Sequence, residues 1–300
     1  MNRNELIERY SEPVKVLDHG WIRVIDCMGD DERIEAVARL SYQKGTRKVS
    51  ETRGLLRYLF SHRHTSPFEQ AVISLDMKMP IFVARQLVRH RTQALNELSG
   101  RYSELPEEFY VPEPAQVCYQ DDKNKQGRSG AFPLIEADQL RGQMRSEAED
   151  AFATYRQYLE AGMSKETARM GLPLSTYTQW CTTMSLHNLL HMLGLRLDKH
   201  AQWETRQVAN AIWEIVQDWC PITAEAFVDF QLEAETLSRQ ELAMMRDIVQ
   251  DWKSMQDDLC ESDNRNKNEH MGQILNTMLR EYGIENKREQ VEMLIKLGLA

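Results

Sequence analysis

The sequence predicts an α/β (α+β) fold, in which one helix-rich domain holds a small, mostly antiparallel sheet and a helical appendage follows at the C-terminus. Short apolar segments bounded by turn formers indicate strands in the first third of the chain. Apolar residues at helical spacing indicate helices over most of the remainder. The composition becomes more polar beyond about residue 237. We therefore place the main domain at residues 1–236 and the appendage at residues 237–300.

The predicted strands are apolar-rich segments that end at turn residues. They cover residues 14–17, 21–24 and 72–77. Asp18, His19 and Gly20 separate the first two segments, so these two are expected to form a hairpin. Pro80 suits the first position of the next helix, because its missing N–H has no intrahelical partner there. That helix is expected to run from Ile81 to about Arg91.

Helical periodicity predicts most of the other elements. They cover residues 30–40, 51–61, 136–159, a segment after Ser164, 176–195, 200–219 and 286–299. Ser66 and Glu69 have the spacing of a capping box, with Pro67 at the first helical position. Turn formers dominate residues 120–130, which predicts a mobile loop, and residues 260–270 are expected to form a linker.

The composition excludes several classes of protein. Charged residues make up 28% and hydrophobic residues 42% of the chain, as in ordinary globular proteins. A net charge of −9 argues against non-specific binding of nucleic acid. No apolar run approaches the roughly 20 residues that span a bilayer, and none follows the N-terminus as in a signal peptide. We expect a cytoplasmic protein with free thiols at Cys27, Cys118, Cys181, Cys220 and Cys260.

Positive charge is concentrated between residues 85 and 101. This segment holds Arg85, Arg89, Arg91 and Arg101, with Glu97 as its only acid. Guanidinium groups repel one another and are rarely buried without a partner, so their clustering indicates a bound anion. Arginine in place of lysine indicates planar, bidentate recognition of a phosphate or a carboxylate.

Further polar residues are candidates for the same pocket. With two arginines of the cluster they form the set Gln86, Arg89, Arg101, Arg169 and Arg196. Each of them could instead be a solvated surface residue. Arg196 lies in an apolar setting and needs either an acid such as Asp198 or a ligand. His187 and His191 have the spacing of a metal pair, but no third ligand is visible, so we expect no metal.

Several motifs together resemble the flavin-dependent thymidylate synthases. The family signature RHR-x7-S matches Arg89-His90-Arg91 and Ser99. The flanking residues 80–86 and 96–102 resemble the family as well. Three more blocks follow the family order, namely His64-x-Ser66-Pro67-Phe68-Glu69, Ala168-Arg169-x3-Pro173, and Leu195-Arg196 with His200-Ala201-Gln202-Trp203-Glu204. The resemblance extends from about residue 14 to residue 230.

The resemblance implies an enzyme that methylates dUMP reductively to dTMP. In this family 5,10-methylenetetrahydrofolate donates the carbon, and FAD reduced by NADPH carries the hydride. The resemblance also implies a homotetramer whose active sites are shared between subunits, with neither nucleic acid nor membrane as a partner. The bottom-up interpretation agrees, since nucleotide phosphate, flavin pyrophosphate and the glutamate tail of folate are all anions that need arginines.

The resemblance also implies the site residues. Those for dUMP are Gln86, Arg89, Glu97, Leu98, Ser99, Gly100, Arg101, Arg169 and Arg196. Those for FAD are Ser66, Arg89, His90, Arg91, Glu97, Ser185, His187 and His191. His64 and Tyr102 are expected near folate and flavin, and Arg196 is expected to be the catalytic residue.

Chemical arguments refine the roles of Arg196 and Ser99 and bear on one further residue, Cys181. A fixed guanidinium at Arg196 would stabilise negative charge on the N3/O4 edge of uracil, which makes carbon 5 nucleophilic. Arginine is too basic to accept a proton at neutral pH, so the expected role is electrostatic. Ser99 has no base placed to activate it, which favours a hydrogen bond to substrate. Cys181 is an unfavoured candidate for the cysteine nucleophile that the unrelated, flavin-free thymidylate synthases use.

A few positions depart from the family pattern. Ala94 and Ser66 stand where serine and threonine are frequent, and Ser185 and His187 stand where asparagine and arginine can occur. The departure at His187 is expected to affect flavin affinity and not the reaction type. Two other classes remain open, namely a non-enzymatic protein that grips anions or nucleic acid through Arg85–Arg101, and another flavin oxidoreductase acting on a different nucleotide.

Overall fold

The computed structural model describes residues 1–40 and 51–259, and the chain divides into two compact units, residues 1–233 and 234–300. The second unit contains helix α10 (Arg239–Leu259). The linker predicted at 260–270 and the helix predicted at 286–299 lie outside the described residues. No helix in the described ranges is long and apolar enough to cross a membrane.

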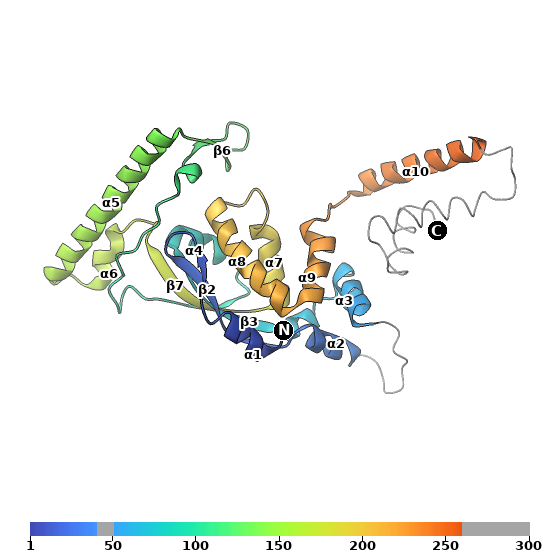
Figure 1. The fold of residues 1–300 in the computed structure, drawn as a ribbon, viewed down its shortest axis with the longest axis horizontal. Coiled ribbons are helices and arrows are strands. Elements are labelled where there is room, and N and C mark those ends of the chain that lie inside the picture. Colours follow the sequence, from blue (N-terminus) through green and yellow to red (C-terminus); the bar gives the residue numbers. More distant parts are fainter. Residues whose placement is uncertain (41–50, 260–300) are drawn as a thin grey trace. The chain divides into compact units, whose positions relative to one another are not determined.

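A five-stranded antiparallel sheet forms the centre of the first unit (Figure 1). Its strands are β1 (Val14–Val16), β2 (Gly20–Met28), β3 (Val72–Pro80), β4 (Ala94–Glu97) and β7 (Tyr177–Ser185), in the order β1-β2-β3-β7-β4. The hairpin predicted around residues 18–20 is confirmed, with Val14 paired to Ile22. The predicted helix-rich α/β fold with a small antiparallel sheet is likewise confirmed.

The helix predicted over residues 176–195 is wrong in its first half. Residues 177–185 form β7, and helix α7 (Leu186–Arg196) starts only after it. Thr178, Trp180, Thr182 and Met184 are buried, which is the alternation of a strand. Threonine and aromatic side chains suit a pleated sheet. Pairing with β3 on one side and β4 on the other overrides the helical period that the sequence suggested.

Helices surround this sheet. They are α1 (Arg3–Arg9), α2 (Asp31–Arg39), α3 (Thr52–Ser61), α4 (Ile81–Leu87), α5 (Leu134–Glu160), α6 (Lys165–Ala168), α8 (Trp203–Trp219) and α9 (Pro221–Phe227), with short turns η1 (Phe68–Gln70), η2 (Pro114–Gln116), η3 (Arg169–Gly171) and η4 (Val228–Leu232). Helices α7 and α8 lie side by side (Figure 1), and α8 packs against β1 and β2. Leu75 and Met77 of β3 share one core with Leu190 of α7 and Ile212 of α8.

Two predictions about helix starts and ends need correction. Helix α4 ends at Leu87 and not near Arg91, and Pro80 is its N-cap as well as the last residue of β3. After Leu87 the chain turns back so that β4 can pair with β7. The capping box at Ser66 is absent, because this segment makes one 3₁₀ turn with Pro67 at its cap and no side-chain bond. The backbone carbonyl of Thr65 accepts the N–H of Phe68 instead.

The predicted loop at residues 120–130 is in part a β-hairpin. Strands β5 (Cys118–Gln120) and β6 (Arg128–Ala131) pair, and residues 121–127 form the connection. Asp121 Oδ1 accepts the backbone N–H groups of Lys123 at 2.8 Å and Asn124 at 2.7 Å, which holds the turn. The hairpin carries Arg128 to the N-terminal end of α8, where its side chain bonds Glu204.

Candidate active site

Arg196, the last residue of α7, contacts the chain just after α4. Its Nε–H donates to His90 Nε2 at 3.0 Å, and its NH2 group donates to the backbone carbonyl of Gln86 at 3.0 Å. Of the two partners expected for Arg196, Asp198 is not found, since that carboxylate accepts from His200 instead, and a ligand is the one that remains. Among the described residues no acid pairs with Arg196, so its positive charge is not neutralised by the protein.

His90 is held neutral in this contact. The side chain is 8% exposed, and burial lowers its pKa to about 4, with the guanidinium of Arg196 and the neighbouring His191 acting in the same direction. Its Nε2 accepts from Arg196, so the ring proton lies on Nδ1. The ring of His191 lies 6.3 Å away, edge to face. A neutral histidine therefore orients the guanidinium without adding a charge.

We expect His90 to titrate far below an ordinary histidine. Its folded pKa lies below the unfolded value, so the unfolded chain binds the extra proton between about pH 6.5 and pH 4. Stability present above this window is therefore lost as the pH falls through it. Histidine ring NMR should place the midpoint near pH 4, and Arg196→Ala should move it upward. A midpoint near 6.5 in the folded protein would contradict this assignment.

A second group of predicted residues gathers around Gly100. This glycine is buried, and a Cβ added to it would lie 3.0 Å from Arg169 Cδ and 3.1 Å from its NH1. Arg101 forms an ion pair of 3.3 Å with Glu166 of α6. Ser99 Oγ accepts the backbone N–H of Arg101 at 3.3 Å, so this hydroxyl oxygen contacts a donor and not a base. A side chain at this position would therefore crowd Arg169 and force it to shift.

The sheet holds the segment between these two groups. Glu97 ends β4, where its Oε1 accepts the hydroxyl of Thr178 at 2.6 Å. The N–H of Leu98 donates to the carbonyl of Gln179 at 2.8 Å and continues the pairing with β7. Backbone groups of residues 97 and 98 are thus fixed to a strand, which is a rigid base for a binding site.

The residues expected to hold flavin come from three parts of the fold. Arg89 and Arg91 are exposed after α4, and neither has an ion-pair partner within the described ranges. Ser185 caps α7 by accepting the N–H of Asn188 at 3.4 Å, and His187 lies in the first helical turn. The segment that carries Ser66 leads into β3, whose first residue pairs with Ser185.

The contacts of the predicted residues fall into two groups. Gln86, His90, His191 and Arg196 form one group, and Ser99, Gly100, Arg101 and Arg169 form another. Within the described part of the chain, no hydrogen bond or ion pair joins the two groups. The two residues expected near folate and flavin belong to neither group. The ring of His64 lies edge-on against Tyr58, and the side chain of Tyr102 is 80% exposed.

Cys181 has the wrong chemistry for a nucleophile. It lies on β7, half-buried, opposite Asp76 of β3. Burial raises the pKa of its thiol, and the charge of Asp76 raises it further. The thiol is therefore protonated at neutral pH, which agrees with the low weight given to it from the sequence. Cys27, Cys118 and Cys220 are also free thiols, and Cys260 lies outside the described residues.

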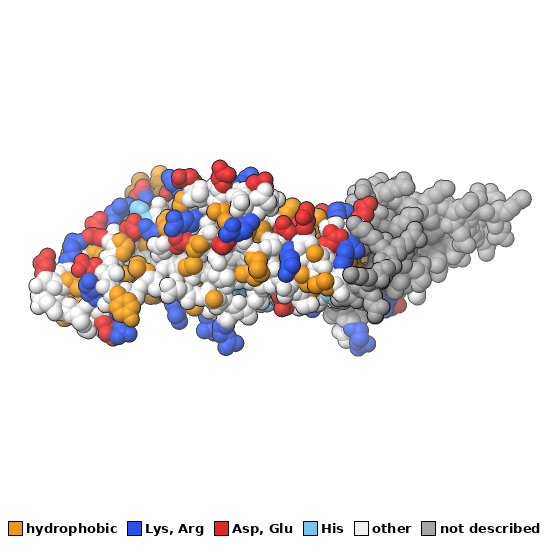
Figure 2. Space-filling view, turned by 90° about the horizontal axis from the view of Figure 1, so that it is seen from below, with side chains coloured by type: hydrophobic (Ala, Val, Ile, Leu, Met, Phe, Trp, Pro, Cys, Tyr) orange, Lys and Arg blue, Asp and Glu red, His pale blue; other side chains and the backbone are white. Residues whose placement is uncertain are grey.

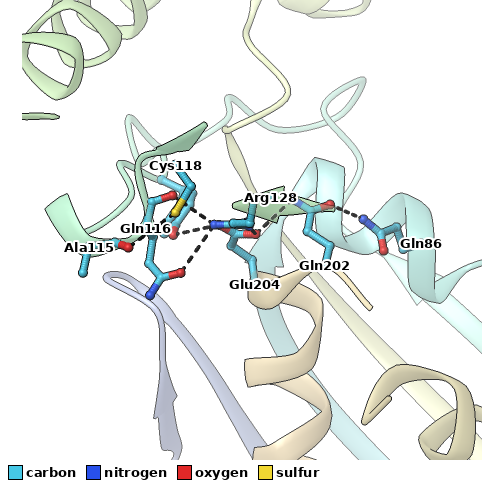
Figure 3. A network of polar contacts seen from close by, with 8 residues as sticks. Gln86, Ala115, Gln116, Cys118, Arg128, Gln202 and Glu204 are labelled. Carbon is cyan, nitrogen blue, oxygen red and sulfur yellow. Dashed lines mark hydrogen bonds and ion pairs between the residues drawn. The ribbon is translucent and has the colours of Figure 1, made fainter. Parts of the chain in front are cut away.

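The sequence interpretation missed the polar network beside Gln86. In Figure 3, Arg128, Glu204, Gln202 and Gln86 follow one another in a row of hydrogen bonds and ion pairs. A signal was present, because Glu204 stands four residues before Val208 on the buried face of α8. A carboxylate on an apolar helix face needs partners.

Comparison with known families defines the class of this protein. A family model described as "Thymidylate synthase complementing protein" matches residues 23–222, which is more than half of the chain. The matched range includes both groups of site residues and the five-stranded sheet, except for β1 and the first three residues of β2.

Individual relatives narrow the class. A flavin-dependent thymidylate synthase of Wolbachia pipientis wMel is 45% identical over 238 residues, which is 79% of this chain and 84% of the relative. Another from Gluconobacter oxydans (strain 621H) is 47% identical over 237 residues, which is 78% of each chain. The chain belongs to the family of flavin-dependent thymidylate synthases, as its motifs predicted.

Solved structures agree with this assignment. A UMP/dUMP methylase PolB from Streptomyces cacaoi, bound with 5-Br UMP, is 32% identical and superposes with a TM-score of 0.66 over 73% of this chain and 98% of that one. The same methylase bound with 5-Br dUMP gives 31% identity and the same TM-score. These relatives and structures confirm the predicted enzyme class. They do not support the alternative of a non-enzymatic binding protein.

Proposed function

We propose that this chain converts dUMP to dTMP, using 5,10-methylenetetrahydrofolate as carbon donor and FAD reduced by NADPH as hydride carrier. The observation that carries this proposal is Arg196, a half-buried guanidinium that contacts neutral His90 and has no acid partner among the described residues. Family membership and the nucleotide-bound methylase structures support the same reaction.

Arg196 would act on the pyrimidine ring. Negative charge on the N3/O4 edge of uracil raises electron density at carbon 5, which then attacks the one-carbon unit. Burial lowers the pKa of Arg196, yet a guanidinium stays protonated at neutral pH. Two hydrogen bonds fix its orientation before substrate binds, as electrostatic preorganisation requires.

The residues near α7 fit a flavin nucleotide. Arg89 and Arg91 offer guanidinium groups for a pyrophosphate, and the capped start of α7 offers a positive helix end. When bound, the reduced flavin supplies the hydride that takes the transferred carbon from the methylene to the methyl level. No hydrogen bond or ion pair among the described residues joins the two residue groups, and the family resemblance implies shared sites, so we propose a cytoplasmic homotetramer with active sites shared between subunits.

The group around Gly100 would hold the nucleotide phosphate, since Arg101 and Arg169 both lie there. Gly100→Ala is expected to weaken dUMP binding about tenfold or more, because a Cβ would displace the Arg169 side chain. Isothermal titration of the flavin-loaded protein measures this. Gly142→Ala on α5 is the matched control, since a Cβ there meets nothing within 4 Å. Equal affinity in both variants would contradict the placement of the phosphate.

The visible spectrum of the purified protein tests the cofactor. A bound flavin gives absorption bands at wavelengths where the protein itself is transparent. We expect these bands either as purified or after incubation with FAD and gel filtration. A protein that remains colourless after both treatments would overturn the proposed function.

The arginine cluster also raised the possibility of a nucleic-acid grip. On the face shown in Figure 2, Lys and Arg side chains alternate with Asp and Glu and form no continuous basic stripe. Sequence-independent binding of nucleic acid depends on a broadly basic surface. That face therefore gives no support to this interpretation, and binding to DNA is not part of the proposed function.

A further inference from the structure

A buried carboxylate lies next to the dUMP-binding candidate Gln86. Glu204, at the start of α8, is 4% exposed and accepts from three donors. These are Arg128 NH2 at 2.7 Å, Gln202 Nε2 at 3.0 Å and the Tyr110 hydroxyl at 3.3 Å. The side chain of Gln202 then meets Gln86, whose Nε2–H donates to Gln202 Oε1 (Figure 3).

The charge of Glu204 sets the direction of this row of bonds. An ionised carboxylate can only accept, so Gln202 must turn its NH2 group toward it. The carbonyl oxygen of Gln202 then faces Gln86, so Gln86 must donate a hydrogen bond from its own NH2 group. An isolated glutamine amide could adopt either orientation. Here the carboxylate of Glu204 selects a single orientation for the side-chain amide of Gln86.

Arg128 connects the β5–β6 hairpin to the same row. Its NH1 group donates to the backbone carbonyl of Gln116 at 3.0 Å, and its NH2 group binds Glu204. This guanidinium balances a buried negative charge that would otherwise be strongly unfavourable. The hairpin therefore holds the carboxylate of Glu204 at a fixed place.

We propose that Glu204 is a positioning residue for dUMP, which acts through Gln202 to fix the side-chain amide of Gln86, with Arg128 of the β5–β6 hairpin holding the carboxylate. This inference rests on the proposed function, because that function places Gln86 at the nucleotide. It also gives a role to the hairpin at residues 118–131, to which the sequence assigned none.

Replacing the carboxylate by an amide of the same size tests the link. In Glu204→Gln the amide can donate as well as accept, so Gln202 and Gln86 lose their enforced orientation. We expect the dissociation constant of dUMP from the FAD-loaded protein to rise about tenfold. In a Gln86→Ala background the same change should alter it less than about twofold, because the group that Glu204 positions is gone. An equal factor in both backgrounds would show a general structural effect and would overturn the inference.

Two further variants cover the case in which Glu204→Gln folds poorly. Gln202→Leu keeps the buried ion pair and breaks the row at an exposed residue, and Arg128→Met releases the carboxylate. Both should weaken dUMP binding, whereas Lys123→Met, an exposed cation of the same hairpin, should not. If Gln202→Leu binds dUMP as tightly as the parent protein does, the inference fails. If the parent protein itself does not bind dUMP, the proposed function fails first.

Discussion

Arg196→Ala is expected to lower dTMP formation by at least about 10²–10³-fold, the range seen when a single preorganised donor to a developing negative charge is removed. Two acceptors lose their donor at the same time, namely His90 Nε2 and the carbonyl of Gln86. Stability should therefore fall by about 1–3 kcal/mol, while the protein stays folded. Product formation at saturating dUMP measures the first effect, and a thermal melt measures the second.

Two variants control for the removal of positive charge. Arg145→Ala removes an exposed arginine of α5 that has no partner among the described residues, and full activity is expected. Arg196→Lys keeps the charge but loses the planar guanidinium whose two nitrogens make the two hydrogen bonds, so its activity should lie between those of the parent and alanine proteins. Retained activity in Arg196→Ala would refute the electrostatic role of this residue.

Trp219→Ala is expected to lower the free energy of unfolding by about 3–5 kcal/mol, the range for loss of a buried aromatic side chain. Trp219 is 1% exposed near the end of α8. Its Nε1–H donates to the carbonyl of Gly29 at 2.7 Å and ties α8 to the turn between β2 and α2. The variant therefore combines a large cavity with a lost hydrogen bond. Urea unfolding followed by circular dichroism, at one protein concentration, measures the change.

Trp219→Phe is the matched comparison for this prediction. Phenylalanine keeps most of the ring volume and loses the N–H donor, so a smaller loss of stability is expected. The residues proposed to bind dUMP lie elsewhere in the fold, so residual folded protein of either variant should still bind dUMP. A midpoint in Trp219→Ala equal to that of the parent protein would contradict the packing described for α8.

The sequence predicted those elements that local pattern determines. The hairpin around residues 18–20, the helix at 51–61 and the long helix at 136–159 needed only turn residues or sustained periodicity. β7 could not be predicted in this way, because its residues also fit a helical period and the decision comes from pairing with β3 and β4. The end of α4 at Leu87 has the same origin, since β4 must reach β7.

The site residues likewise fall into those that the sequence could predict and those that depend on tertiary contacts. Motif matching located Arg196, and the structure confirms that it is half-buried, but its partner His90 could not be inferred from spacing 106 residues away. The low pKa of His90 depends on burial and on two neighbours from α7, Arg196 and His191. Glu204 was visible as a charge on an apolar face, whereas its link to Gln86 through Gln202 depends on a tertiary contact.

Release of tritium from carbon 5 of labelled dUMP tests the central claim most directly. The FAD-loaded protein, supplied with NADPH and 5,10-methylenetetrahydrofolate, is expected to release tritium into water in step with dTMP formation, and omission of either co-substrate should stop both. No release from a protein that binds FAD and dUMP would contradict the assignment of Arg196 and the reaction proposed for this chain.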